Sequence, residues 1–378
     1  MKAPPDLVLL GGGHAHLHVL EALATKKWPP VRAILVSPSS RQIYSGMVPG
    51  YLHGRYAEDQ ISIDLAGLCR AAGVEFIEAA AELIEADARE VHTPDRTVRF
   101  SLLSLDIGSA PRGLELPGVQ ENAIALRPMG SVVALRRRID ERVEECSGGG
   151  DVVRIAVVGA GAGGVEVALA VDRRIRDRGG RPAVVLVDHG SEILTGFSER
   201  AQEKTKGILR KRGIGLLLEH QVLGVSADAI QVDGGGPIGA DLVVWATGAA
   251  PPPLLSDSKL PRSDAGYLRV DATLRAVDGS PIWGAGDCVD LAGHDLPKAG
   301  VFAVRQGPVL AENLRAALVD EEPSAYRPQS SYLSILNTAD GKALLTWRAL
   351  HAHSSLAWYL KDWIDRGHVR RFSGPEPL

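Results

Sequence analysis

The chain has 378 residues, of which 45% are hydrophobic and 23% are charged, enough for two or more domains with sizeable cores. Its 42 Lys and Arg against 46 Asp and Glu give a net charge of −4, which excludes the basic footprint of a nucleic-acid-binding protein. The three cysteines form no Cys-x-x-Cys pair, so neither a disulfide framework nor a zinc site is expected, and the predicted location is the reducing cytoplasm.

Short apolar runs alternate with helix-forming segments along most of the chain, which predicts an α/β fold. The first run is predicted to be a strand and not a signal peptide, and no stretch is predicted to span a membrane. The first half predicts strand 6–11, helix 14–24, strand 31–37, a loop over 42–54, a helix ending at 67–73, strand 74–77, a hairpin over 82–98 and strand 102–107. An SGGG linker at 147–150 is expected before the second half. After it, the pattern indicates strand 154–159, helix 164–176, strand 183–188, helix 205–212 and strands 214–219, 241–248 and 282–287. In the tail from residue 326, two short strands and a helix over 355–365 are expected.

A glycine-rich fingerprint occurs twice: residues 7–16 read LVLLGGGHAH and residues 154–166 read RIAVVGAGAGGVE. The first glycine of such a fingerprint allows a tight turn, and the second lets the backbone approach a pyrophosphate at the N-terminus of the following helix. Two fingerprints predict two bound dinucleotides, most economically a flavin and a nicotinamide nucleotide between which a hydride passes.

The second fingerprint is complete, with Gly159, Gly161 and Gly164 at the required spacing. Asp188 ends the next predicted strand, where a carboxylate accepts the ribose hydroxyls and repels a 2′-phosphate. This favours NADH over NADPH, and a solvated turn aspartate is the alternative. Gly248, after a later apolar run, lets the chain turn close to a cofactor or forms a plain structural turn.

The first fingerprint departs from the pattern, because Gly11 and Gly13 are followed by His16 in place of the third glycine. Its second strand ends in Ser37 and Pro38, where an acidic ribose ligand is usual. The serine hydroxyl still offers a hydrogen bond to a ribose, but without the charge. Both departures leave the strength of flavin binding open.

His14 and Ala15 lie at the start of the first helix and are predicted to contribute to the cofactor site. His14 and His18, four residues apart, share a helix face that suits zinc, but no third ligand has suitable spacing. Packing and helix-terminus roles are therefore favoured, and no metal is predicted. Gly286 and Asp287 follow another apolar run, where an aspartate beside glycines suits a sugar hydroxyl and a phosphate, or only a turn.

In their order and spacing, GGGHAH, DIGSAP, GAGAGGVE, ATG, GAGDC and KAGVFAVRQG resemble the pyridine nucleotide–disulfide oxidoreductases over nearly all of residues 7–314. The resemblance implies two Rossmann-like three-layer domains, with the NAD-binding domain inserted in the FAD-binding domain, and a small C-terminal α+β region. The implied boundaries are 1–112 and 268–325 for FAD, 113–267 for NAD(P)H and 326–378 for the C-terminal region.

The resemblance also implies that the first fingerprint, Ser109 and Gly286 belong to the FAD site, with Asp287 on the ribitol chain. A helix starting near Gln306 and Gly307 would point its positive end at the flavin pyrimidine.

Three catalytic candidates follow from the resemblance. Glu166 would lie near the nicotinamide and the flavin, and Lys298 and Gln306 would face the edge of the flavin ring. A glutamate favoured by the helix dipole in the first turn is an equal alternative for Glu166.

Residues 43–56 hold no cysteine, which disfavours dithiol relay chemistry. What remains is similar to type II NADH dehydrogenases, which pass electrons from NADH through FAD to a quinone. GGGHAHLHVL, YSGMVPGYLHG and PKAGVFAVRQGPVLAENL further resemble the flavoprotein module often fused to selenide, water dikinase, which implies such a partner but no kinase activity.

The predicted function is an FAD-dependent NADH dehydrogenase with a quinone or another non-thiol acceptor. One alternative is an oxidoreductase of sulfur or selenium species that uses Cys288. The other is a low-turnover flavin-binding module of selenophosphate synthesis.

The tail helix places Leu356, Leu360, Trp363 and Ile364 on one face and mixes aromatic with basic residues. This pattern suits a peripheral position on the inner face of a membrane, where a quinone is found. Packing on the flavin domain, a homodimer interface and contact with a dikinase are the alternatives.

Overall fold

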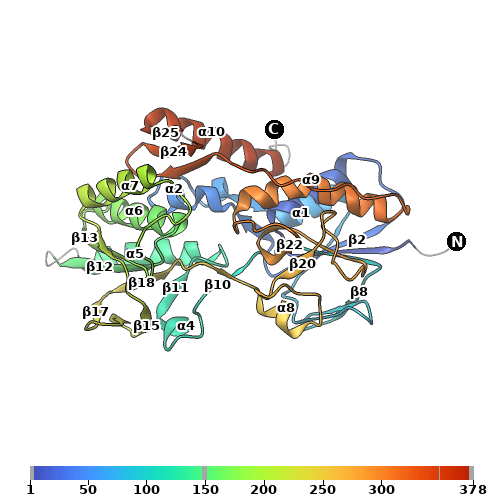
Figure 1. Cartoon of the computed structure of the whole chain (residues 1–378), viewed down its shortest axis with the longest axis horizontal. Helices are drawn as coiled ribbons and strands as arrows, with labels where there is room; N and C mark the ends of the chain where they lie inside the picture. Colours follow the sequence, from blue (N-terminus) through green and yellow to red (C-terminus); the bar gives the residue numbers. More distant parts are fainter. Residues whose placement is uncertain (1–3, 147–150, 349, 374–378) are drawn as a thin grey trace.

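The computed structural model describes residues 4–146, 151–348 and 350–373, so the predicted linker at 147–150 lies outside the described residues. Two α/β bodies lie side by side, and the C-terminal segment, in dark red, runs along one side of both (Figure 1). Each body is built around a parallel five-stranded sheet, which confirms the predicted fold class. Within the described ranges, no helix is both long and apolar enough to cross a membrane.

The first sheet has the strand of the first fingerprint at its centre. Its order is β21-β9-β1-β2-β5, and all neighbours are parallel. The apolar residues of its two central strands have almost no exposed surface, as is typical of a parallel sheet. The elements around this sheet are β1 (Asp6–Leu10), α1 (His14–Thr25), β2 (Arg32–Ser37), α3 (Leu65–Ala72), β5 (Glu75–Glu78), β9 (Leu102–Leu105), β20 (Leu268–Val270), β21 (Ile282–Gly284), β22 (Val289–Leu291) and α9 (Gly300–Ala317).

The second sheet repeats this plan around the second fingerprint, with the order β11-β18-β12-β13-β14 and all neighbours parallel. In both sheets the fingerprint strand lies between the strand that follows it and a strand from much later in the chain. The elements of this body are α4 (Val119–Asn122), β11 (Ala123–Ala125), α5 (Ser131–Cys146), β12 (Val152–Val158), α6 (Ala162–Asp177), β13 (Arg181–Val187), α7 (Glu199–Arg212), β14 (Gly215–Leu217), β15 (Val222–Val225), β16 (Ala229–Val232), β17 (Ile238–Gly239) and β18 (Leu242–Trp245).

The second body is inserted into the first, as predicted. The chain leaves the first body through β10 (Ala110–Pro111) and returns through β19 (Ala249–Ala250), and these two strands pair antiparallel. After the return, β21 pairs with β9 and α9 packs on α1. The boundaries at 112, 267 and 325 stay predictions.

Three predicted segments are wrong in detail. The segment 42–54 was predicted as a loop, but β3 (Arg41–Ile43) pairs with β4 (Ser62–Asp64). A 3₁₀ turn and the short helix α2 (Val48–Leu52) follow β3. Pro49 lies in the first turn of α2, where the fixed φ of proline matches that of a helix. The predicted hairpin over 82–98 is a meander of β6 (Leu83–Glu85), β7 (Glu90–His92) and β8 (Thr97–Arg99).

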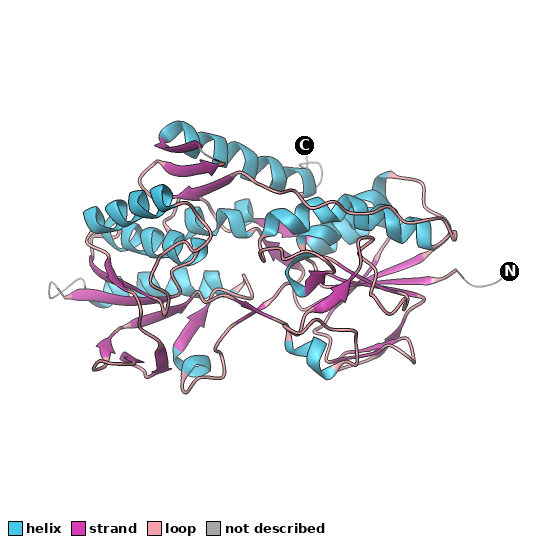
Figure 2. Cartoon of the chain, viewed as in Figure 1, coloured by secondary structure: helices cyan, strands magenta, loops and turns pink. Residues whose placement is uncertain are grey.

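The tail has three strands where two were predicted: β23 (Ser334–Asn337), β24 (Ala343–Trp347) and β25 (Leu350–Ser354). They precede α10 (Ser355–Phe372), which extends about two turns beyond the predicted end. This region contacts both bodies, since α10 lies against β4 and β23 lies against α6. Figure 2 shows its strands and its long helix beside the helices of the two bodies.

Candidate nucleotide-binding and acceptor site

The two glycine turns share one construction at the carboxyl ends of β1 and β12. Gly11 and Gly159 both have positive φ, at +92° and +109°. A Cβ on Gly11 would lie 2.4 Å from the carbonyl oxygen of Asp106, and one on Gly159 would lie 2.4 Å from that of Ala246. Both turns therefore press against the chain that leaves the neighbouring strand, which only glycine permits.

The turn of the second body is open where a pyrophosphate would bind. Gly161 is exposed at the N-terminus of α6, and a Cβ added there would meet nothing within 4 Å. A Cβ on Gly164, in contrast, would lie 1.8 Å from the carbonyl oxygen of Gly159, so the third glycine lets the helix approach the turn. We call the glycine turn and the N-terminus of the helix that follows it the cradle. The free backbone N–H groups and the helix dipole of this cradle fit an anionic group, and the cradle therefore fits the pyrophosphate of a dinucleotide.

Asp188 lies immediately after β13 beside this cradle. Its Oδ2 accepts a hydrogen bond from the backbone N–H of Ala160 at 2.6 Å, and its Oδ1 accepts one from Gly190 at 2.7 Å. These bonds fix the carboxylate next to the glycine turn and leave lone pairs for ribose hydroxyls. Gly248 is exposed, with no atom within 4 Å of an added Cβ. The cofactor roles of Asp188 and Gly248 stay predictions.

In the first body a histidine replaces the third glycine and is part of the core. The fully buried ring of His16 donates from Nδ1 to the carbonyl oxygen of Gly11 at 2.6 Å and accepts at Nε2 from Ser104 at 2.8 Å. Burial lowers the pKa of His16 to about 4, so the ring is neutral near pH 7. A third glycine would let the helix approach the turn closely. His16 instead makes two hydrogen bonds, one to the turn at Gly11 and one to Ser104 of β9.

The turn of the first body is filled by a carboxyl group that the sequence analysis missed. Oδ2 of Asp106 accepts from the backbone N–H groups of Ala15 at 2.7 Å and His16 at 3.1 Å. A Cβ on Gly13 would lie 2.2 Å from the carboxyl carbon of Asp106. The motif DIGSAP, which places an aspartate directly after an apolar strand, was the available signal. The donors that fit a flavin pyrophosphate are present, and Asp106 occupies them.

The other predicted FAD residues lie around this turn. Asp287 accepts from the hydroxyl of Ser109 at 3.5 Å and lies 3.7 Å from the guanidinium of Arg127, and burial raises its pKa. The backbone N–H of Gly286 donates to Oε1 of the buried Gln306 at 2.7 Å, so Gln306 supports the turn that carries Asp287.

Lys298 and the end of β2 are held by local contacts. Nζ of Lys298 lies 2.5 Å from a carboxylate oxygen of Asp290 and 3.8 Å from the centre of the Tyr267 ring. The hydroxyl of the buried Ser37 donates to the carbonyl of Ser39, and Pro38 is exposed. The assigned roles of Lys298, Ser37 and Pro38 stay predictions.

The predicted helix start near Gln306 and Gly307 is wrong, because α9 begins at Gly300. Gly307 lies within the helix, where its N–H belongs to the helical ladder, and a Cβ on it would lie 2.5 Å from the ring of His18. Its role in the structure is therefore the close packing of α9 on α1. The N-terminus of α9 at Gly300 faces His14 instead, with 3.3 Å between an added Cβ and the imidazole ring.

A cluster of ionisable groups joins both bodies to the C-terminal region. Oε1 of Glu166 on α6 accepts from the backbone N–H of Asn337 at 2.6 Å. Lys361 on α10 lies 2.9 Å from Oδ2 of Asp365 and donates to the carbonyl of Gly46 at 2.9 Å. The hydroxyl of Tyr44 donates to Oδ1 of Asp365 at 3.3 Å. The sequence analysis missed Lys361, Asp365 and Tyr44 as a group, since they meet only in the folded chain.

The surroundings of this cluster shift its protonation. Burial raises the pKa of Glu166 to about 7, against the opposing effects of Lys361 and the Asn337 N–H. Burial also raises the pKa of Tyr44, and the charge of Asp365 adds to this effect. Burial lowers the pKa of Lys361, but the carboxylates of Asp365 and Glu166 outweigh it and raise the pKa overall. Glu166 therefore exchanges a proton near neutral pH while Lys361 stays charged.

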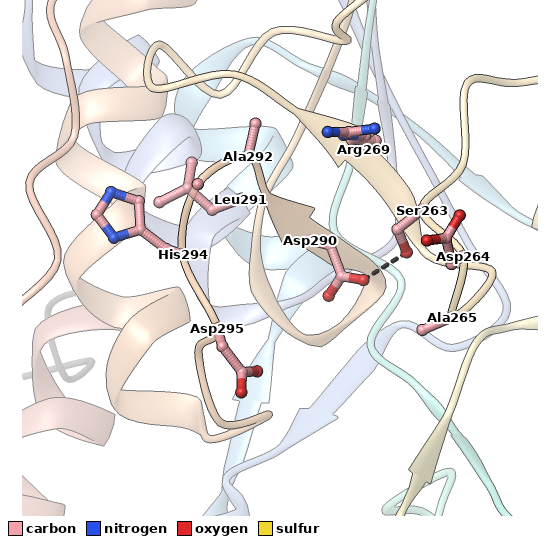
Figure 3. A pocket seen from close by; sticks show the side chains of 10 residues that line it. Ser263, Asp264, Ala265, Arg269, Asp290, Leu291, Ala292, His294 and Asp295 are labelled. Carbon is pink, nitrogen blue, oxygen red and sulfur yellow. Dashed lines mark hydrogen bonds between the residues drawn. The ribbon is translucent and has the colours of Figure 1, made fainter.

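A surface hollow of about 460 Å³ lies apart from the glycine turns (Figure 3). Asp264, Asp290 and Asp295 line it, and Ser263 donates a hydrogen bond to Asp290. None of the residues that line the hollow belongs to either glycine turn or to a helix N-terminus, the features that would hold the pyrophosphate of a dinucleotide. Its other lining residues are Ala265, Arg269, Leu291, Ala292, Gly293 and His294.

The molecule has two bodies, each with a parallel sheet and an equivalent glycine turn, and the second body is inserted into the first. This arrangement defines the fold class of two-dinucleotide oxidoreductases. The model of the family described as pyridine nucleotide-disulphide oxidoreductase matches residues 5–307. The chain belongs to this family, which confirms the resemblance and identifies the chain as an oxidoreductase.

Similar proteins include the demethylphylloquinone reductase NdbB of Synechocystis, 25% identical over 349 residues that cover 88% of this chain and 85% of the relative. The external alternative NADH-ubiquinone oxidoreductase of Yarrowia lipolytica is 26% identical over 357 residues, covering 84% and 60%. The solved structure of NDH2 from Plasmodium falciparum in complex with NADH superposes with a TM-score of 0.80 at 14% identity, covering 98% of this chain and 97% of that one. The sulfide:quinone oxidoreductase of Aquifex aeolicus has a TM-score of 0.81 at 17% identity, covering 98% and 93%. These relatives confirm the resemblance to type II NADH dehydrogenases.

Proposed function

We propose that the chain is an FAD-dependent NADH dehydrogenase that passes electrons to a quinone. The observation that carries this proposal is the position of Glu166, on the helix of the open cradle and among residues of the first body and the C-terminal region. Glu166 lies on α6, five residues after Gly161, and accepts a hydrogen bond from Asn337 of the C-terminal region, which supports its assignment as a proton-exchanging group between the NADH cradle and an acceptor site. The names of NdbB and of the Yarrowia enzyme, which both include a quinone, support the choice of acceptor.

NADH would bind with its pyrophosphate at the N-terminus of α6 and its ribose at Asp188. FAD would take the first cradle, with Ser37 at its ribose and with Ser109, Gly286 and Asp287 along its linker. When bound, FAD accepts a hydride from NADH and passes electrons onward. Hydride transfer needs positioning and no general base, and the charged cofactors are oriented by helix termini and hydrogen bonds.

Reduction of a quinone by NADH takes up one proton from solvent in addition to the hydride, because the quinol carries two hydrogens. Glu166, with its pKa raised to about 7, is suited to deliver that proton and to recover it. The ammonium of Lys361 offers a hydrogen bond to developing negative charge on a quinone oxygen, because Asp365 and the carbonyl of Gly46 engage only two of its three N–H groups.

Lys361 and Tyr44 both contact Asp365, which holds them in place.

We also propose that α10 brings the acceptor site to a membrane surface. Leu356, Tyr359 and Trp363 are 80%, 63% and 74% exposed, and Leu360 and Ile364 extend this apolar face. Large exposed apolar side chains on one helix suit the interfacial layer of a bilayer. Trp358 and Phe372 do not belong to this face, because both are buried against the protein. Cosedimentation with anionic vesicles should fall at least about tenfold in Trp363→Glu, whereas the exposed Arg370→Ala should reduce it much less.

The sulfur or selenium alternative lacks a reactive thiol. Cys288 is fully buried, its thiol donates to the carbonyls of Ala285 and Leu105, and burial raises its pKa to about 12. A thiol in this state is a poor nucleophile. All three cysteines are free and buried. The dikinase partner, the accessory role and the homodimer stay predictions from the sequence.

The Glu166→Gln variant tests the assignment. In rapid-mixing experiments, reoxidation of the reduced flavin by a soluble quinone should slow by about 10²–10⁴-fold, the usual contribution of a general acid or base. NADH-dependent flavin reduction should change much less. Equal slowing of both steps would show that Glu166 acts only on folding or on positioning of both cofactors. An unchanged quinone step would exclude it as the proton donor.

A further inference from the structure

The position of Asp106 conflicts with a simple pyrophosphate site in the first body. Its carboxyl accepts from the backbone N–H groups of Ala15 and His16, which begin α1. These are the donors that a helix N-terminus offers to a pyrophosphate. The carboxyl also fills the turn itself, since Cβ atoms on Gly13 and Gly286 would lie 2.2 and 2.6 Å from its atoms.

The second body provides an internal comparison for this acid. Ala246 follows β18 as Asp106 follows β9, and each lies with its carbonyl oxygen against the first glycine of its turn. Ala246 has only a methyl group, and the cradle at Gly161 is open. The same architecture therefore has a phosphate cradle in one body and an acid inside the cradle in the other.

A carboxylate and a pyrophosphate do not share one set of donors without a large electrostatic cost. Asp106 is only 3% exposed, so little water reaches it to screen the repulsion. A neutral carboxyl group removes the repulsion and supplies an O–H that can donate to a phosphate oxygen. Protonation thus converts Asp106 from a competitor into a partner of the ligand.

The groups around Asp106 favour protonation. Burial raises its pKa to about 7, against the hydrogen bonds from the His16 and Ala15 N–H groups, and the nearby charge of Asp287 raises it further. The Cys288 thiol also faces it and stays neutral because burial raises the thiol pKa to about 12. The ring of His16 is neutral as well, since burial lowers its pKa to about 4.

The cationic side chains near this site lower the pKa of Asp287 rather than that of Asp106. Arg127 lies 3.7 Å from Asp287, and Lys298 also lowers the pKa of that residue. His14, the remaining titratable group at this end of α1, lies 2.5 Å from Gln42 through Nδ1, and burial lowers its pKa to about 4.

We propose that Asp106 links loading of the first dinucleotide site to the uptake of one proton, with the pyrophosphate binding when the acid is neutral. The proton comes from solvent and stays on the carboxyl while the cofactor is bound. This inference rests on the proposed function in taking FAD as the dinucleotide. It makes Asp106 a positioning residue that sets how FAD affinity depends on pH.

The test is titration of the full-length apoprotein with FAD at pH 6 and pH 8. If only the neutral acid admits FAD, affinity scales with its neutral fraction and is about tenfold weaker at pH 8, given a pKa of about 7. Calorimetry at pH 8 in buffers of different ionisation enthalpy should show uptake of close to one proton per FAD.

The Asp106→Asn variant keeps an oxygen acceptor for the helix N–H groups but cannot ionise. It should bind FAD with the same affinity at both pH values, at least about tenfold tighter than the wild type at pH 8, and without proton uptake. Asp188→Asn changes the carboxylate of the other cradle and is the matched control, which should keep the proton uptake on FAD binding. The proton count in the wild type needs no variant and decides the matter if Asp106→Asn fails to fold.

Two results would overturn the inference in distinguishable ways. Wild-type protein that binds FAD equally at pH 6 and pH 8 without proton uptake would overturn the role of Asp106 and leave the proposed function intact. Failure of both wild type and Asp106→Asn to bind FAD at either pH would overturn the proposed function and the inference with it.

Discussion

The glycine turn after β1 and the glycine turn after β12 share one backbone geometry but differ in the side chains around them. The second turn keeps all three glycines and leaves Gly161 open to solvent. The first turn replaces the third glycine with a buried histidine and fills its centre with Asp106. The comparison teaches that a fingerprint defines where a helix meets a strand, whereas residues from distant strands decide what the cradle admits.

The largest expected effect on cofactor binding comes from Gly164, which lets α6 approach the glycine turn of the second body. In Gly164→Ala the new Cβ would lie 1.8 Å from the carbonyl of Gly159, and backbone cannot yield as a flexible side chain does. We expect a loss of about 1–3 kcal/mol in the free energy of unfolding and at least about 100-fold weaker NADH binding. Gly163→Ala is the matched control, since its Cβ would meet nothing within 4 Å. Calorimetry with NADH compares the two variants, and equal affinities would remove the steric account of the third glycine.

The next effect tests whether His16 does the work of the missing glycine. His16→Gly completes the fingerprint on paper but leaves the Gly11 carbonyl and the Ser104 hydroxyl without their partner. We expect the free energy of unfolding to fall by about 2–4 kcal/mol, from the lost hydrogen bonds and the cavity.

The same histidine predicts a pH dependence. The pKa of His16 in the folded chain, about 4, lies below its ordinary value of 6.5. Its contribution to stability is therefore complete above about pH 6.5 and is lost as pH falls toward 4. Thermal unfolding of wild type and His16→Gly between pH 5 and pH 8 measures both effects, and a variant as stable as the wild type would refute the structural role.

Moving the acid between the bodies sharpens the comparison further. Ala246→Asp places a carboxyl at the position in the second body that Asp106 has in the first. We expect NADH binding to become about tenfold weaker, because the ionised carboxylate repels the pyrophosphate, and the loss to shrink at pH values low enough to protonate the acid. Ala246→Asn has similar volume and no charge, so its NADH affinity should not depend on pH. Equal pH profiles for the two variants would show that the difference between the cradles is steric.

The smallest expected effect concerns nucleotide choice. Asp188→Ala removes a carboxylate that repels a 2′-phosphate and accepts ribose hydroxyls. The ratio of NADH to NADPH affinity should fall about five- to tenfold, as expected for loss of hydrogen bonds to a charged group. If the ratio is unchanged in fluorescence titrations, the preference does not depend on this residue.

Much of the fold could be predicted from the sequence, because local patterns specify it. Apolar β-branched runs followed by glycines indicated the parallel strands and both turns. The start of α9 is an exception, because the helix begins at Gly300 and not near Gln306 as predicted. Proline usually occurs in the first helical turn, but Pro308 lies in the middle of this helix.

The site was less predictable because its groups come together from far apart in the chain. Asp106 meets α1 some 90 residues away, and Tyr44 meets Asp365 across 321 residues. No local spacing encodes such contacts, so Glu166 was a candidate from resemblance while its partners on α10 were missed.

The most direct test of the account is an anaerobic titration of the FAD-loaded protein with NADH, following flavin absorbance by stopped flow. The account predicts rapid bleaching that is complete at one NADH per bound FAD, and recovery of the oxidised spectrum when a quinone is added. Bound flavin that stays oxidised in excess NADH would contradict it, because two loaded cradles would then not exchange a hydride.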